Sequence, residues 1–468
     1  MIATSLPIIA VYAQMTLLGS NTAFLSSLAA LMDLMVALAV ILLIGGRIPQ
    51  RLWLGLAAPA ALLLAAVAWG AWGLLPFARS DWTTSFSAAH GASALSVTPD
   101  RTLLELSKLL GAGAIALAAA LTAASIERLW LCVRLLLVVA ALHTMLSLGL
   151  YAVDPNTVAG YAKGGHQWRL TGTLLNANAF ATSLAMTAAV AAAKFRVELR
   201  RFQDTPSGAR SNKFIQVGVA AILLFLFAGA CALTTSRTAL AALALCVIAV
   251  IFWPGRKTAH RPDEEDRKGR WRQAAWGFGS AAVALSLAIV LTGGETLNRL
   301  SSIEADLPTR LDAFRLALTR IAAAPLTGYG MGSFMAVAPP GADLELGTRI
   351  WNMGAAHNAW LQAALEGGVP FAVLLTLAAL AMLAPALFRP AAGSAERAVR
   401  IGFAAALAVV VICSSVDIAL NVPAVAAQAM LILGMLTGAV LGPSARPPGR
   451  RRPRPDATDD EAASLGGK

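Results

Sequence analysis

Apolar runs of about twenty residues follow one another along most of the chain, separated by short polar segments. A helix of about 20 apolar residues is long enough to cross the roughly 30 Å hydrocarbon core of a bilayer. The pattern therefore predicts an all-α, polytopic membrane protein with about twelve transmembrane helices. The expected spans are residues 5–20, 23–45, 52–76, 103–124, 129–151, 173–193, 214–233, 238–254, 274–292, 357–388, 401–419 and 423–441.

Composition supports this class. Of 468 residues, 57% are hydrophobic and 13% are charged, whereas soluble domains carry about 25% charged residues. A soluble enzyme with one anchor, a transmembrane barrel and a disordered chain are thereby excluded. All four cysteines, Cys132, Cys231, Cys246 and Cys413, lie inside apolar runs, which predicts packing residues and neither disulfides nor a thiolate metal site. Without a basic segment before it, the first span is expected to be retained as a helix and not cleaved as a signal peptide.

The distribution of basic residues predicts the topology. Twelve spans place both termini on one side, and that side carries 25 of the 37 Lys and Arg residues against 10 in the connections on the other. By the positive-inside rule the basic side is cytoplasmic, including a tail over 446–468 that is expected to be disordered. Basic residues on the cytoplasmic side set the topology and contact lipid headgroups, which accounts for the net charge of +12. No nucleic-acid partner is needed to explain it.

The outer side then receives four connections, at 77–102, 152–172, 234–237 and 293–356. The last is too long for a simple connection, and loops of this length are usually functional. Within it, residues 308–323 have apolar side chains at helical spacing, which predicts an amphipathic helix on the outer surface. These side chains are Leu311, Phe314, Leu318 and Ile321. The glycine-rich run 328–332 follows this helix and not a strand, which favours a tight turn over a nucleotide loop.

Polar residues on the outer side form a sparse set of arginines and one histidine. Arg169, Arg237 and Arg310 could bind one anion together, because guanidinium groups bind phosphate bidentately and stay charged. His357 could accept a proton from a hydroxyl near neutral pH. Arg237 could instead snorkel to headgroups, and His357 could be a packing residue. Arg315 and Arg320 fit the solvated face of the surface helix better.

No motif for a divalent cation is present. The outer carboxylates, Asp154, Glu304, Asp306, Asp312 and Glu345, are scattered and lack a paired-carboxylate or histidine motif. We therefore expect no metal and no other cofactor, so the arginines would have to neutralise a leaving phosphate themselves.

Four outer segments together resemble the O-antigen ligase and O-antigen polymerase family of membrane glycosyltransferases. Their sequences are Thr171-Gly-Thr-Leu-Leu-Asn-Ala-Asn-Ala-Phe180, Thr235-Ser-Arg-Thr-Ala-Leu240, Arg310-Leu-Asp-Ala-Phe-Arg315 with Pro325-Leu-Thr-Gly-Tyr-Gly-Met-Gly-Ser-Phe334, and His357-Asn-Ala-Trp-Leu-Gln-Ala-Ala-Leu-Glu-Gly-Gly368. The resemblance covers roughly residues 165–370. Phe314 departs from it, because the family usually has tryptophan there.

The resemblance implies a metal-independent, inverting glycosyltransferase in the bacterial inner membrane. It would transfer a glycan from undecaprenyl pyrophosphate to a sugar hydroxyl of lipid A–core at the periplasmic face. His357 would then be catalytic, and Arg237, Arg310 and Arg169 would bind the pyrophosphate. The supporting residues would be Asn358, Glu366, Asn176, Asn178 and Ser236.

Two alternatives stay open, one within this class of enzyme and one outside it. A polymerase of O-antigen or exopolysaccharide would use the same site with a lipid-linked glycan as acceptor. A secondary transporter would place polar sites at mid-membrane, where this chain has only Asp33, Arg134 and His143, which fit isolated interhelical contacts. The expected organisation is N-terminal helices over 1–164, a catalytic core over 165–370, C-terminal helices over 371–445 and the tail.

Overall fold

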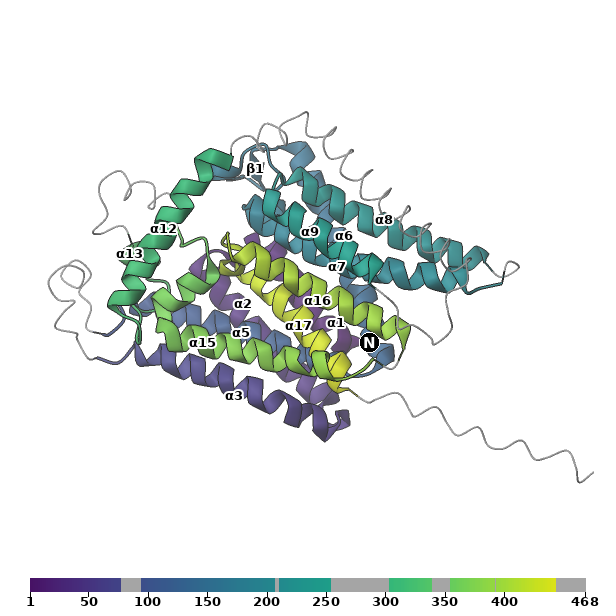
Figure 1. Cartoon of the computed structure of the whole chain (residues 1–468), viewed down its shortest axis with the longest axis horizontal. Coiled ribbons are helices and arrows are strands. Elements are labelled where there is room, and N and C mark those ends of the chain that lie inside the picture. Colours follow the sequence, from purple (N-terminus) through teal and green to yellow (C-terminus); the bar gives the residue numbers. More distant parts are fainter. Residues whose placement is uncertain (77–93, 207–209, 254–302, 339–353, 392, 443–468) are drawn as a thin grey trace, which may run out of the picture.

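The computed structural model is a bundle of long helices with one helix across its end (Figure 1). It describes residues 1–76, 94–206, 210–253, 303–338, 354–391 and 393–442. The long helices are α1 (Ile2–Thr16), α2 (Ala23–Ile44), α3 (Gln50–Trp72), α5 (Pro99–Thr122), α6 (Ile126–Val153), α7 (Ala177–Gln203), α8 (Ser211–Leu233), α9 (Arg237–Phe252), α15 (Ala359–Phe388), α16 (Ser394–Ser414) and α17 (Pro423–Leu441).

The described residues contain nine helices that are long and apolar enough to span a membrane, and α1 and α9 are shorter apolar helices. This is a multi-pass membrane protein, as the hydropathy pattern predicts. The expected span at 274–292 lies outside the described residues, as do the tail at 446–468 and most of the connection at 77–102.

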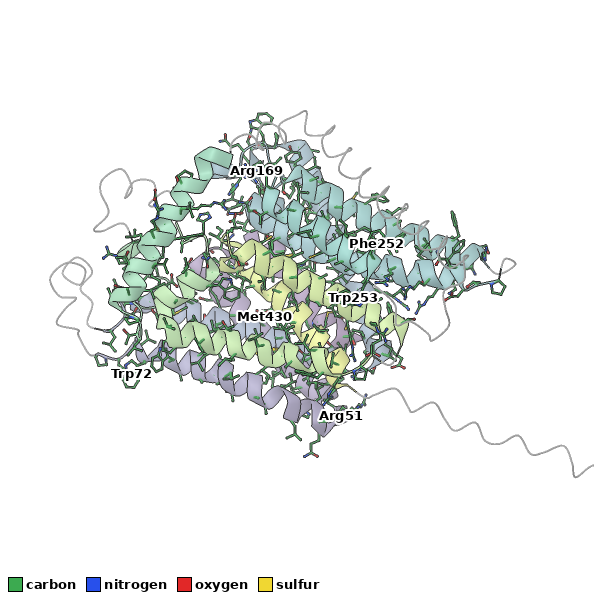
Figure 2. The ribbon with its side chains drawn as sticks, viewed as in Figure 1. Arg51, Trp72, Arg169, Phe252, Trp253 and Met430 are labelled. Atoms are coloured by element: carbon green, nitrogen blue, oxygen red, sulfur yellow. The ribbon has the colours of Figure 1, made fainter. Side chains whose placement is uncertain are left out.

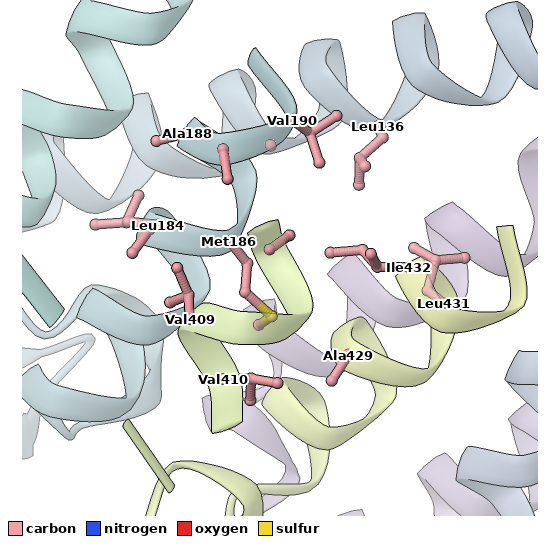
Figure 3. Packing of buried hydrophobic residues seen from close by; sticks show 14 of the residues in the cluster. Leu136, Leu184, Met186, Ala188, Val190, Val409, Val410, Ala429, Leu431 and Ile432 are labelled. Atoms are coloured by element: carbon pink, nitrogen blue, oxygen red, sulfur yellow. The ribbon is translucent and has the colours of Figure 1, made fainter. Parts of the chain in front are cut away.

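Two helices form the centre of the bundle. α7 and α17 are buried along most of their length, and α7 contacts α8, α9 and α16 while α17 contacts α1, α5 and α15. Figure 3 shows Met186 of α7 among Val410 of α16 and Ala429 of α17. The many alanines of α7 allow its neighbours to approach closely, because association in lipid depends on close packing. All four cysteines are free and buried within such contacts, as predicted.

The outer connections contain short ordered elements. β1 (Thr157–Val158) and β2 (Tyr161–Ala162) form an antiparallel hairpin that the sequence pattern does not predict. Several short 3-10 turns accompany the long helices: η1 (Leu18–Ser20), η2 (Gly45–Arg47), η3 (Gly164–His166), η4 (Gly172–Leu174) and η6 (Ala419–Asn421).

The predicted surface helix is present as α12 (Ile303–Ala323), followed by the short α13 (Phe334–Val337). α12 crosses one end of the bundle at a steep angle to the long helices (Figure 1). Of its four expected apolar side chains, Leu311 and Leu318 are 42% and 54% exposed, and Phe314 and Ile321 are half-buried. Ala313 and Ala317 are the buried residues of α12, where small side chains allow close packing.

Two backbone irregularities are present. α15 breaks at Gly368, which has φ 78° and ψ 166°, two residues before Pro370. α8 and α9 are joined by the tight turn at 234–236, in which Thr235 has a left-handed φ of 54°. Three expected boundaries are wrong: α7 continues to Gln203 and not to residue 193, and α16 begins at Ser394 and ends at Ser414 instead of spanning 401–419. Asp417 therefore lies in a turn between α16 and α17.

Candidate functional site

The candidate site lies where several helices begin at the same end of the bundle. α7, α9 and α15 begin at residues 177, 237 and 359, close to Arg169, Arg237 and His357 respectively. Helix N-termini carry partial positive charge and exposed N–H groups, which favour a bound anion. Figure 2 shows Arg169 at this end, near α12 and away from Trp253 at the end of α9.

Asp417 is the residue that joins the site. Its Oδ2 accepts a hydrogen bond from Asn178 Nδ2 at 2.6 Å and lies 3.5 Å from Arg310 Nη2. Its Oδ1 accepts from the backbone N–H of Ile418 at 2.7 Å and lies 3.8 Å from His357 Nδ1. One carboxylate therefore contacts side chains from α7, α12 and the segment before α15.

Sequence reasoning missed Asp417, because the expected span 401–419 included it and an isolated carboxylate there gave no motif. A usable signal existed: a charged side chain inside an apolar run is costly in a bilayer and by default marks a functional site.

Arg310 approaches this turn from α12. Its guanidinium donates to the carbonyl oxygen of Val416 as well as pairing with Asp417. About a quarter of the side chain, 26%, remains exposed. A guanidinium has five N–H donors, so Arg310 retains donors for a ligand.

Arg169 is held by protein groups on several sides. Nε donates to the carbonyl oxygen of Thr234 at 2.9 Å, Nη2 donates to Asn178 Oδ1 at 2.9 Å, and Nη1 lies 3.3 Å from His166 Nδ1. Its own carbonyl accepts from Lys163 Nζ at 3.1 Å. Burial lowers the pKa of the Lys163 ammonium, and Asp154 opposes this shift.

These contacts connect two of the predicted arginine segments. Arg169 ties the segment before α7 to the turn that carries Arg237, and Asn178 continues the connection from Arg169 to Asp417. Arg237 is the first residue of α9 and is half-buried. Ser236, beside it, donates its backbone N–H to Thr234 Oγ1 at 3.2 Å.

The two asparagines at helix starts have a clear local role. Asn176 Oδ1 accepts the N–H groups of Asn178 and Ala179, and Asn358 Oδ1 accepts those of Trp360 and Leu361. Both are therefore N-caps of their helices. Asn358 also donates through Nδ2 to the carbonyl oxygen of Ser415 at 2.9 Å, which holds α15 against the turn that carries Asp417.

His357 has an unusual backbone conformation. Its φ is +51°, a left-handed value that a non-glycine residue rarely adopts. Such strain persists only where neighbouring contacts enforce it. The side chain is 17% exposed, so the imidazole is largely enclosed but still reaches the surface of the site.

Glu366 stabilises the glycine-rich turn. Its carboxylate accepts from the N–H of Gly332 at 2.8 Å and of Phe334 at 3.4 Å, and from Gln362 Nε2 at 3.0 Å. A Cβ on Gly328 would lie 2.5 Å from the carbonyl oxygen of Glu366. The run 328–332 is thus a tight turn packed on the break in α15, as predicted.

The other polar residues discussed from the sequence lie apart from this cluster. Arg315 is 79% exposed beside Asp312, as expected for a solvated face, whereas Arg320 is half-buried. His143 and Asp33 make the expected interhelical contacts, with Thr173 Oγ1 at 2.9 Å and Gln14 Nε2 at 2.6 Å. Arg134 differs, because it is exposed on α6.

Comparison with known proteins gives one family match. Residues 222–376 match the family model described as O-antigen ligase. The chain therefore contains an O-antigen ligase domain, of the kind shared by ligases and polymerases of O-antigen. The matched range includes Arg237, Arg310, His357, Asn358 and Glu366. No curated protein matches the chain.

Proposed function

We propose that the protein transfers a glycan from undecaprenyl pyrophosphate to a sugar hydroxyl of lipid A–core, as an O-antigen ligase at the periplasmic face of the bacterial inner membrane. The observation that carries this proposal is the shared contact of Arg310 and His357 with Asp417, because it brings an anion-binding group and a base to one place.

The proposed reaction is a direct displacement at the anomeric carbon. The acceptor hydroxyl oxygen forms a bond to C1 while the bond from C1 to the phosphate oxygen breaks. The acceptor proton goes to His357, and the diphosphate leaves with the electron pair. Because the nucleophile attacks opposite the leaving group, the anomeric centre inverts.

Each residue has a defined part in this proposal. His357 Nδ1 is the nitrogen near Asp417, so Nε2 is the one that would accept the proton, and the carboxylate would stabilise the imidazolium that forms. Arg310 and Arg237, aided by the N-termini of α9 and α15, would stabilise charge on the departing diphosphate. Asn178, Asn358, Asn176, Ser236 and Glu366 would support the geometry of the site.

The test is a reaction of purified protein with lipid-linked glycan and lipid A–core in the presence of EDTA. We expect glycan on the core, and loss of about 10²–10⁴-fold in rate for His357→Ala, as is typical for removal of a general base. Arg315→Ala is the matched control, because Arg315 is 79% exposed outside the cluster. Transfer at the wild-type rate by His357→Ala would refute the assignment of the base.

The same reaction separates the ligase from the polymerase. Lengthening of the lipid-linked glycan without modification of the core would show that the acceptor is a second lipid-linked glycan and that the protein is a polymerase. If neither the core nor the lipid-linked glycan gains sugar residues, the proposed function as a whole is contradicted.

A further inference from the structure

Gln362 occupies the centre of a hydrogen-bond network beside the candidate base. It lies on α15, one turn after the helix begins. Its Oε1 accepts from Asn421 Nδ2 at 2.8 Å and faces the backbone N–H of Ala356 at 3.4 Å. Its Nε2 donates to Glu366 Oε1 at 3.0 Å. The backbone N–H of Ala356 can only donate, so it fixes the orientation of the Gln362 amide with Oε1 facing Ala356 and Nε2 facing Glu366.

One end of this network holds the backbone of His357. Ala356 immediately precedes His357, whose φ of +51° needs enforcement by its neighbours. Ala356 is fully buried, and Asn358 on the other side is fixed as the N-cap of α15. The contact from Gln362 to Ala356 therefore restrains the strained residue from its N-terminal side.

The other end holds the turn that carries Asp417. Asn421 ends η6, four residues after Asp417, and Gln362 fixes it from α15. The same helix start holds the beginning of this turn, because Asn358 and Trp360 donate to the carbonyl and hydroxyl oxygens of Ser415. Asp417 thus lies between two points that are both attached to the first turns of α15.

We propose that Gln362 is a positioning residue that sets the separation of His357 and Asp417. A single amide restrains both segments whose relative position decides the distance of 3.8 Å between Nδ1 and Oδ1. Gln362 does not touch the reacting groups itself. The proposal rests on the proposed function, since it assigns a role relative to His357 as base.

Gln362→Met tests this directly, because methionine keeps the length of the side chain and removes all three polar contacts. We expect kcat to fall by about 10–100-fold, since a displacement near 1 Å can cost about 10²-fold. The KM values for donor and acceptor should change by less than about two-fold, because the diphosphate-binding arginines stay in place. The pH profile of kcat should also change, since the contact of the imidazole with the carboxylate changes.

Gln428→Met is the matched control. Gln428 is also a buried glutamine, and its Nε2 donates to Thr187 Oγ1 at 2.9 Å and to the carbonyl oxygen of Ser183 at 3.3 Å, inside the bundle. We expect this variant to lose thermal stability but to keep the kcat and pH profile of the wild type. Equal losses of kcat in both variants would show a general structural effect and overturn the proposal.

Asn421→Ala provides a second, independent variant, and it carries the test if Gln362→Met does not fold. It removes the contact to η6 alone, so kcat should fall by less than in Gln362→Met. The double variant should be no slower than Gln362→Met, because both changes break one network. Wild-type kcat in Gln362→Met, or in Asn421→Ala when measured alone, would refute the inference. His357→Ala measured alongside distinguishes the failures: an active His357→Ala refutes the proposed function, whereas an inactive one with unaffected Gln362→Met refutes only this inference.

Discussion

Asp417 shows how one carboxylate can organise polar side chains from distant segments. Asn178, Arg310 and His357 all approach it, although 239 residues separate Asn178 from Asp417. A buried carboxylate is stabilised only when such donors surround it. The residues of the cluster therefore depend on one another, because loss of one side chain would leave its buried partners without a hydrogen bond or ion pair.

Asp417→Asn should lower the rate of glycan transfer by about 10–100-fold, because removing a charge from a close, desolvated pair commonly costs 1.4–3 kcal/mol. The amide keeps the volume but cannot stabilise an imidazolium as a carboxylate does. Single-turnover rates with purified protein measure the effect. Asp312→Asn is the control, because its partner Arg315 is largely exposed. An unchanged rate in Asp417→Asn would remove Asp417 from the site.

Arg169→Lys separates the effect of the positive charge from the effect of the guanidinium shape. The guanidinium spans Thr234 O and Asn178 Oδ1, each at 2.9 Å, which a single ammonium cannot reach together. If Arg169 mainly fixes these segments, lysine should lose nearly as much activity as alanine. Transfer rates for both variants decide this, and near-complete retention by lysine would assign Arg169 a purely electrostatic role on the diphosphate.

At the scale of elements, helix contacts in the bundle depend on glycine. Gly434 and Gly438 of α17 face α5, and Gly442, just after α17, faces Ala124, just after α5. A Cβ on each glycine would lie 2.1–2.2 Å from a backbone carbonyl oxygen. The contact therefore allows no side chain at these positions. In lipid such close approach replaces the hydrophobic effect as a source of association.

Gly438→Ala should destabilise the bundle by about 1–3 kcal/mol, as is typical of overpacking. Gly229→Ala in α8 is the matched control, because nothing lies within 4 Å of its Cβ position. This control should be neutral or slightly stabilising, since alanine favours a helix over glycine by up to about 1 kcal/mol. Thermal unfolding in detergent compares the two, and equal midpoints would contradict the packing argument.

The elements also show what sequence could and could not predict. Hydropathy located most ends of the long helices within a few residues, because crossing a bilayer imposes length and apolarity on each. The end of α7 and both ends of α16 are the exceptions. The polar residues of the outer connections led to Arg169, Arg237, Arg310 and His357 as candidates for the site. Asp417 was missed because an apolar run hides where a helix ends. The buried alanines of α12, Ala313 and Ala317, were not predicted, because spacing alone does not favour them over the leucines. Both depend on tertiary packing, which spacing along one helix does not encode.

At the scale of the whole molecule, the site and the basic last turn of α7 lie at opposite ends of that helix. α7 begins beside the cluster and continues for 27 residues to Gln203, which corresponds to about 40 Å of helix. Its far end carries Arg200 and Arg201 in the last turn. The separation exceeds the thickness of the hydrocarbon core, so the two ends would face opposite aqueous compartments.

Cysteine labelling tests this orientation. Tyr161 is 57% exposed in the hairpin next to the site, and Asp204 is exposed just after α7. The native cysteines are buried, so they should contribute little background to the labelling. Because the positive-inside rule places the basic end in the cytoplasm, a membrane-impermeant maleimide should label Tyr161→Cys in cells whose outer membrane is permeable. Asp204→Cys should react only after the inner membrane is opened. The reverse order would place the cluster in the cytoplasm, where the proposed periplasmic transfer could not occur.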